Sequence, residues 1–379
     1  MLTVQQIDRA LQAAILSHNM SIVKSILSIV AAPAGSSMPH DEGERSIVER
    51  AVHSSLRFIN PSFDTSLDML KMLLGAGAKL PNDSYETVYI VEALRYPFCT
   101  LLQRAIFLEN LEMAKFLIRN GINLNSPAGW SRSADLYLSG RSALQAAVAI
   151  QSFELVDLLL GAGADVNSPA ANPTGATALQ FACQRNNLKI VKVLINAGAD
   201  INASPAPVNG ATALQFAAAN GNFDMVQLLL LHKARINAPP AKICGFTALE
   251  GAAVNGRLDM VQYLLSMGAD ISGPLNPQYG RAVGLAWKNG HITLANYLQE
   301  QKLSIDGQEP TQTLESILEA PDVRFWGSPW NWIKRWTDSC FSSCGIEPGI
   351  IIHGPSKVVD GSLKSMVNLA LHRGLEPPS

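Results

Sequence analysis

The chain has 379 residues, a formal net charge of −2 and a charged fraction of 16%. This charged fraction lies below the roughly 25% of ordinary globular proteins, and the apolar fraction of 47% excludes a disordered polypeptide. The near-neutral balance, without any run of lysines and arginines, argues against direct nucleic-acid binding. The five cysteines are odd in number and widely spaced, so they do not suggest a disulfide framework.

The N-terminal segment MLTVQQIDRALQAAIL predicts an amphipathic helix, because it lacks the basic start and apolar core of a signal peptide. No run of eighteen or more apolar residues follows, so we expect no membrane-spanning helix. Together these features predict an intracellular protein, located in the cytoplasm or the nucleus.

Residues 1–139 predict helix pairs of irregular spacing. A first pair covers residues 10–27, and LDMLKMLLGAGAKL supplies a second helix from Leu67. Helix starts follow Ser46 and Thr100, each with Glu or Gln three residues later, which is the spacing of a capping box. The segments PNDSYETVYIVEALRYPF and NSPAGWSRSADLYLS are insertions between these units.

Residues 140–302 repeat with a period of 35 residues. Glycine recurs at Gly140, Gly175, Gly210, Gly245 and Gly280. A period of this length indicates stacked supersecondary units. Capping boxes open the first helix of four units, in the pairs Ser142 and Gln145, Thr177 and Gln180, Thr212 and Gln215, and Thr247 and Glu250.

Each unit continues with a second apolar stretch, such as LKIVKVLI, whose 3.6-residue period predicts a helix. Asn-Gly turns at Gly221 and Gly256 separate the two helices. The glycine of GAGAD stands where a helix end requires positive φ. Segments such as NASPAPVN then predict a stiff, protruding finger. Helices this short are stable only when neighbouring units bury their shared faces.

These motifs resemble the ankyrin repeat, whose unit is usually about 33 residues long. TALQFA stands where the family has T-P-L-H-x-A, with alanine for proline and glutamine for histidine. The resemblance implies an all-α ankyrin-repeat solenoid of about eight helix-turn-helix units with Pro-rich fingers. The TALQ style is similar to ankyrin proteins of filamentous fungi, some of which resemble regulators encoded beside secondary-metabolite genes.

The last unit, RAVGLAWKNGHITLANYLQEQ, places Ala282 at the cap position. Residues 303–379 form a less regular extension in which Trp326, Trp330, Trp332 and Trp336 cluster with Lys334 and Arg335. Three interpretations remain open: a segment that covers the last repeat, an exposed motif for a partner or a membrane interface, or a partly disordered tail.

Signals for enzymatic chemistry are weak. The chain carries none of the motifs G-x-x-x-x-G-K-[ST], H-E-x-x-H and G-x-S-x-G, and GAGADV follows a predicted helix where a dinucleotide loop would follow a strand. The histidines lack paired spacing, and Cys340 with Cys344 is a single C-x-x-x-C pair, so we expect no metal site. Cys99 and Cys183 fit small core positions. We predict no catalytic residues and no cofactor.

Aromatic and arginine side chains on the fingers and insertions are the best candidates for binding a partner, because such residues dominate the energy of protein interfaces. They are Trp130, Arg132 and Tyr137 on the long finger, Tyr85, Tyr89 and Tyr96 in the preceding insertion, and Tyr279 on a regular finger. Alternatively, these rings pack the insertions onto the array.

The sequence therefore predicts a monomeric, non-catalytic module that binds another protein through the concave surface and fingers of a repeat array. The fungal resemblance adds a role as transcription co-regulator as an alternative. A second alternative is a peripheral membrane adaptor that acts through the tryptophan-rich extension.

Overall fold

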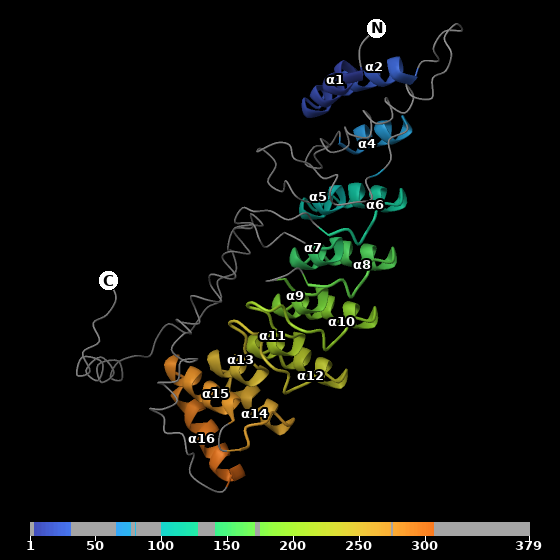
Figure 1. Ribbon diagram of the computed structural model, residues 1–379. Helices are drawn as coiled ribbons and strands as arrows, with labels where there is room; N and C mark the ends of the chain where they lie inside the picture. Colours follow the sequence, from blue (N-terminus) through green and yellow to red (C-terminus); the bar gives the residue numbers. More distant parts are fainter. Residues whose placement is uncertain are drawn as a thin grey trace, which may run out of the picture.

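The computed structural model describes residues 4–31, 66–76, 80, 100–127, 141–170, 175–273 and 276–306. These residues contain fifteen α-helices, and their only β-type pairing is an isolated bridge. Figure 1 shows the helices stacked in pairs along one elongated array. The predicted all-α repeat solenoid is confirmed, while the count of eight units stays a prediction.

Seven helix pairs and one single helix make up the described array. The first pair is α1 (Val4–Leu16) and α2 (Met20–Ala31), followed by the single α4 (Ser66–Gly75). The remaining pairs are α5 (Leu101–Phe107) and α6 (Leu111–Arg119), α7 (Ala143–Ala149) and α8 (Phe153–Gly161), α9 (Ala178–Gln184) and α10 (Leu188–Asn196), α11 (Ala213–Asn220) and α12 (Phe223–Leu231), α13 (Ala248–Val254) and α14 (Leu258–Ser266), and α15 (Pro277–Lys288) and α16 (Ile292–Asp306).

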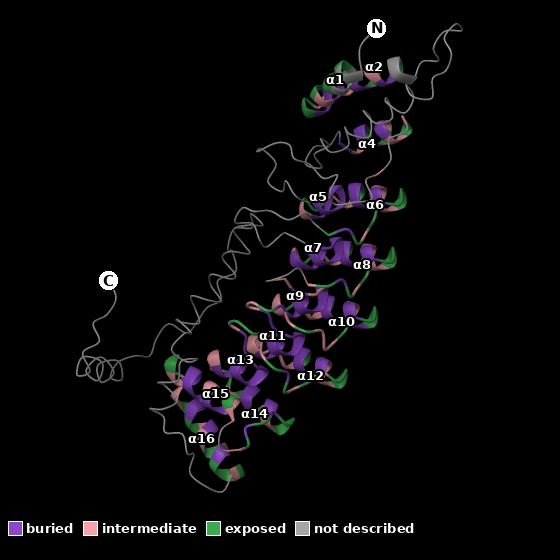
Figure 2. Ribbon diagram, in the orientation of Figure 1, coloured by how far each residue is buried: buried purple, intermediate pink, exposed green. Residues whose placement is uncertain are grey.

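From α5 onward, Figure 2 shows the first helix of each pair largely buried, with exposed residues at the ends of the second helices. All seven residues of α7 are buried, and four of them are alanine. Small side chains let neighbouring helices approach closely, so each pair can bury the apolar face of the next.

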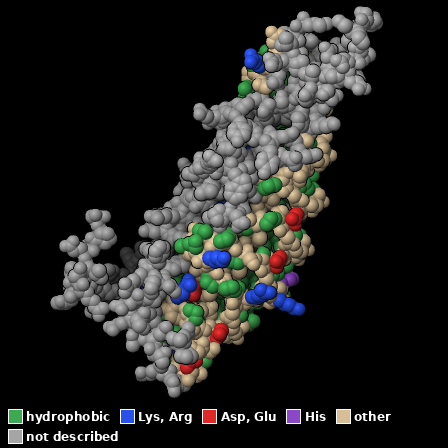
Figure 3. Space-filling model, viewed as in Figure 1, with side chains coloured by type: hydrophobic (Ala, Val, Ile, Leu, Met, Phe, Trp, Pro, Cys, Tyr) green, Lys and Arg blue, Asp and Glu red, His purple; other side chains and the backbone are tan. Residues whose placement is uncertain are grey.

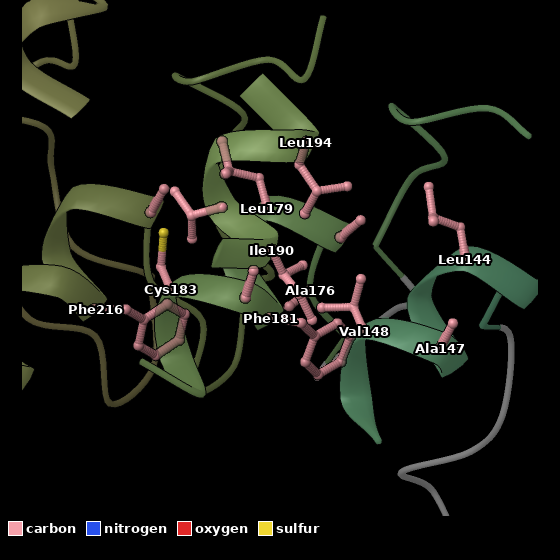
Figure 4. Close-up of a cluster of buried hydrophobic side chains, with 14 of the residues drawn as sticks. Leu144, Ala147, Val148, Ala176, Leu179, Phe181, Cys183, Ile190, Leu194 and Phe216 are labelled. Atoms are coloured by element: carbon pink, nitrogen blue, oxygen red, sulfur yellow. The ribbon is translucent and has the colours of Figure 1, made fainter. Parts of the chain in front are cut away.

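One hydrophobic cluster runs from α1 to α16. Figure 4 shows part of it, where Val148 of α7, Phe181 of α9 and Phe216 of α11 lie among the leucines and alanines of adjacent repeats. Cys183 is fully buried in this cluster, which confirms its predicted place in the core. Burial raises the pKa of the Cys183 thiol far above its usual value, because the thiolate would lose its hydration.

Five capping boxes start the first helices of successive repeats. In each box the cap side chain accepts a hydrogen bond from the backbone N–H three residues later, and the side chain at that later position accepts the backbone N–H of the cap residue. The cap residues are Thr100, Ser142, Thr177, Thr212 and Thr247. Positive φ at Gly163, Gly198 and Gly268 likewise confirms the predicted helix ends. Local sequence therefore fixes where most helices begin and end.

The start of α15 differs from the prediction, which placed the cap at Ala282. The helix begins at Pro277, and the Asn276 side chain accepts a hydrogen bond from the Tyr279 backbone N–H. Asparagine followed by proline is a favoured helix start, since asparagine caps the first turn and proline has no N–H to leave unpaired there. Ala282 is consequently buried in the middle of the helix.

Candidate functional site

In three repeats the base of the finger is held by the glutamine of the capping box. Gln145 accepts the Ser142 backbone N–H through Oε1 and donates through Nε2 to the Ser168 and Pro169 carbonyls, both at 2.9 Å. Gln180 and Gln215 repeat this pattern, with Nε2 bonded to carbonyls 23 and 24 residues further along. A buried amide is both donor and acceptor, so one side chain joins the start of a helix to the base of a finger.

Asparagines link one repeat to the next. Asn167 Oδ1 accepts the Asp200 backbone N–H at 2.8 Å, and its Nδ2 donates to the Gly198 carbonyl at 3.1 Å. Asn202 and Asn237 make the equivalent pair of bonds one and two repeats further on. This asparagine ladder fixes the spacing of the turns along one edge of the array.

Two finger tips pair directly through their backbones. Val208 and Ile243 form a parallel bridge, in which the Asn209 N–H donates to the Ile243 carbonyl at 2.9 Å. Gly210 and Gly245 close these fingers, and a Cβ on Gly245 would lie 2.1 Å from the Ala241 backbone nitrogen. At Gly210 and Gly245 the recurrent glycine therefore stands at a sterically tight return of the finger, and Ile243 is left 55% exposed at the tip.

The exit turns of the 35-residue repeats are the last residue of α8, α10, α12 and α14 with the four residues after it, namely 161–165, 196–200, 231–235 and 266–270. Three of them end in an aspartate whose Oδ1 accepts the backbone N–H two residues later, at Asp165, Asp200 and Asp270. The exit turn 231–235 instead reads Leu-His-Lys-Ala-Arg.

The regular pattern changes where α13 meets α15. Glu250 takes the place of the capping-box glutamine, and its buried carboxylate lies 3.2 Å from Arg281 Nη2. Arg281 also donates to the Gly245 carbonyl at 3.0 Å. A carboxylate cannot donate to finger carbonyls as an amide does, so the next repeat supplies the positive charge that Glu250 requires.

Lys302 completes this closing arrangement. Its Nζ donates to the Ile271 and Gly273 carbonyls and lies 2.8 Å from Asp306 Oδ2. Gly273 stands 23 residues after Glu250, where a glutamine amide would bond in a regular repeat. The hydrogen bond from Lys302 holds the pKa of the Asp306 carboxyl below its usual value.

Tyr279 is the one predicted partner-binding residue that the structure describes, and its predicted place on an exposed finger is wrong. It lies in the first turn of α15 and is 2% exposed, with Lys302 Nζ 5.1 Å from the ring centroid. Because α15 begins as early as Pro277, the Tyr279 side chain belongs to a helix and is buried within the last repeat of the described array. Burial raises the pKa of the Tyr279 hydroxyl.

The other candidates lie outside the described residues. They are Trp130, Arg132 and Tyr137 within 128–140, and Tyr85, Tyr89 and Tyr96 within 81–99. Their role in partner binding stays a prediction. Along the described part of the chain, no helix is long and apolar enough to cross a membrane. Within that same part, no three His, Cys, Asp or Glu side chains are grouped as metal ligands would be.

Comparison with known proteins defines the class of this array. The family model for ankyrin repeats in three copies matches residues 102–205 and, again, residues 204–274. Residues 102–274 are therefore ankyrin repeats, as their motifs predicted. A search of curated proteins found no match. The fungal resemblance stays a prediction.

Two parts of this surface were not predicted from the sequence. The glutamines were assigned only to their own helix caps, although their amides also reach carbonyls 23 and 24 residues away. The asparagine ladder was missed as well. Its only signal was the return of asparagine, two residues after aspartate or arginine, at Asn167, Asn202 and Asn237.

Proposed function

We propose that this protein is a non-catalytic scaffold that binds another protein through its fingers and the concave face of its array. Ankyrin repeats generally mediate protein–protein interaction and are typically non-enzymatic. The observation that best supports a finger surface is the backbone bridge between Val208 and Ile243, which fixes two neighbouring tips with exposed side chains.

Rigid presentation favours binding, because a surface that is already ordered loses little conformational entropy on association. The finger bases are tied to the helices by Gln180 and Gln215, and the repeats are tied together by Asn202. An extended array of this kind offers a long platform with many points of contact for another protein.

The test is affinity purification with mass spectrometry from cells that express the protein. The wild type is compared with Ile243→Asp at a finger tip and with the double variant Trp130→Ala/Tyr137→Ala. Ile305→Asp is the matched control, since Ile305 is 54% exposed on α16 and away from the fingers. We expect specific partners to be lost from both finger variants and kept by the control. Partners that are unchanged in all variants would exclude the fingers as the binding surface.

Two narrower roles remain hypotheses. A transcription co-regulator should be enriched in the nucleus and should co-purify with a DNA-binding factor. A peripheral membrane adaptor should float with liposomes, and replacement of Trp326, Trp330, Trp332 and Trp336 by alanine in the full chain should abolish that flotation.

A further inference from the structure

The exit turn 231–235 departs from the other exit turns at four of its five positions. The equivalents of Leu231 are Gly161, Asn196 and Ser266, and the equivalents of Arg235 are Asp165, Asp200 and Asp270. Lys233 replaces Gly163, Gly198 and Gly268. His232 replaces two alanines and Met267.

Two of these replacements remove features that shape the other exit turns. Lys233 has φ +64°, a conformation in which the other exit turns use glycine because a Cβ is strained there. Arg235 has no acceptor atom, so it cannot accept the backbone N–H that the aspartates accept in the other turns. The backbone is nevertheless held in the same place, because Asn202 Oδ1 accepts the Arg235 N–H at 2.8 Å.

The replaced side chains are presented to solvent. Leu231 is 78% exposed, and His232, Lys233 and Arg235 are all exposed. Within the described part of the chain, neither Lys233 nor Arg235 forms an ion pair. Strain and lost bonds at an exposed position are typical of a functional site.

The charge pattern around this turn is also distinctive. Asp165 and Asp200 precede it in the row of exit turns, and Asp270 follows it. Figure 3 shows basic side chains and a histidine between acidic side chains along the edge of the array where the second helices end. The basic residues are confined to one exit turn, and both adjacent exit turns carry an aspartate. A partner segment that is acidic along its whole length would be repelled by these aspartates, so the pattern selects against it.

We propose that residues 231–235 form a docking site for a short segment of a partner protein in which one or two acidic residues adjoin an apolar side chain. Lys233 and Arg235 bind the carboxylates, and Leu231 contacts the apolar side chain. Neutral or basic residues flank the acidic residues and lie against Asp200 and Asp270. This site rests on the proposed protein-binding function and adds a second contact surface to the fingers.

The experiment selects a displayed library of random dodecapeptides on the full-length protein. Selected peptides are resynthesised with a fluorescent label, and their affinities are measured by polarisation. The test variant is Lys233→Gly/Arg235→Asn, which restores the glycine and a side chain able to form the aspartate-type turn. Lys192→Glu is the control, because it makes the same charge change of −2 at an exposed residue of α10.

We expect peptides with Asp or Glu beside Leu, Ile or Phe, and an affinity at least about tenfold weaker for the double variant than for the wild type. Lys192→Glu should bind as the wild type does. The double variant should melt no lower than the wild type, so lost binding will not be lost folding. In the wild type, a carbodiimide should cross-link Lys233 to a peptide carboxylate.

Three results would overturn the docking site: no enriched peptide, equal binding by the double variant, or a cross-link from Lys233 to a carboxylate of its own chain. The finger surface is tested separately by Ile243→Asp. Partners that depend on Ile243 while no peptide depends on Lys233 would contradict this site and leave the scaffold function standing.

Discussion

The regular repeats and the closing repeat bond their finger carbonyls with different chemistry. Between residues 141 and 239, the uncharged Gln145, Gln180 and Gln215 each bond both a helix cap and a finger. Where α13 meets the closing repeat, α15 and α16, the corresponding groups are Glu250 of α13 with Arg281 of α15, and Lys302 with Asp306 of α16.

The difference in chemistry depends on whether a repeat is followed by another regular repeat or by the closing repeat. A glutamine can occupy this position in repeat after repeat, because its amide is neutral and can both donate and accept hydrogen bonds. At the closing repeat, charged side chains of α15 and α16 reach back to the preceding unit instead. A buried charge is stable only with its partner, so the end of the array should be more sensitive than its middle to the loss of a single side chain.

Arg281→Ala should have the largest effect, because it leaves the Glu250 carboxylate buried without a counter-charge. We expect the free energy of unfolding to fall by about 3 to 5 kcal/mol, measured by urea denaturation. Glu250→Gln/Arg281→Ala is the control, since it restores the glutamine of the other repeats. A double variant as unstable as the single one would show that the ion pair is not what Arg281 contributes.

Gln215→Glu tests the same rule in the middle of the array. Phe246 stands where Arg281 would be, so the new carboxylate would face the Ala238 and Pro239 carbonyls without a cation. We expect a loss of about 3 kcal/mol. Gln215→Glu/Phe246→Arg should recover part of it. If Gln215→Glu left the free energy of unfolding unchanged, the middle of the array would tolerate a carboxylate without the cation that Glu250 has at the end.

Lys302→Met should release the closing repeat selectively. It removes the buried donor to the Ile271 and Gly273 carbonyls, which should cost about 2 kcal/mol, and it also breaks the ion pair with Asp306. Hydrogen exchange should become faster in α15 and α16 while α9 and α11 keep their protection. Uniformly faster exchange would mean that the array unfolds as one unit.

Asn202→Ala should have a smaller effect, because the asparagine ladder is exposed to water. Loss of its bonds to Lys233 and Arg235 should lower the unfolding free energy by about 1 kcal/mol. Asn196→Ala, at the exposed end of α10, is the control and should lie within about 0.5 kcal/mol of the wild type. Equal effects of the two changes would argue against a stabilising ladder.

Acidification should weaken the closing repeat through His291. Burial lowers the pKa of this imidazole from 6.5, despite its contact with the Val254 carbonyl. A lowered folded pKa means that the unfolded chain binds the proton first, so stability present above pH 6.5 is lost as the pH falls through the folded value. The protection factors of α16 against hydrogen exchange, which correct for the intrinsic pH dependence of exchange, should therefore fall from pH 7 to pH 5.

His291→Asn is the control for this pH dependence. Asparagine does not titrate, and Asn187 and Asn222 precede the second helices of earlier repeats as caps. An equal fall in the protection factors of this variant would assign the effect to other groups. The Asp306 carboxyl, whose pKa is lowered by Lys302, should act only below pH 3.8.

The amino-acid sequence by itself determined the repeat, the helix caps and the turn glycines of this protein. Those features depend on bonds between residues three to five positions apart, as between Thr212 and Gln215. The start of α15 is also determined locally, by Asn276 and Pro277. The 35-residue pattern predicted the cap at Ala282 instead, because that is the position of the cap in the regular repeats.

Only the tertiary structure decided what the same side chains do between repeats. The amide of Gln215 meets Ala238, and Lys302 meets Tyr279 and Gly273, because stacking brings distant segments into contact. The exposure of Leu231 and the strained backbone of Lys233 are likewise properties of the folded array. Sequence spacing fixes partners within one helix, whereas partners across repeats depend on the geometry of packing.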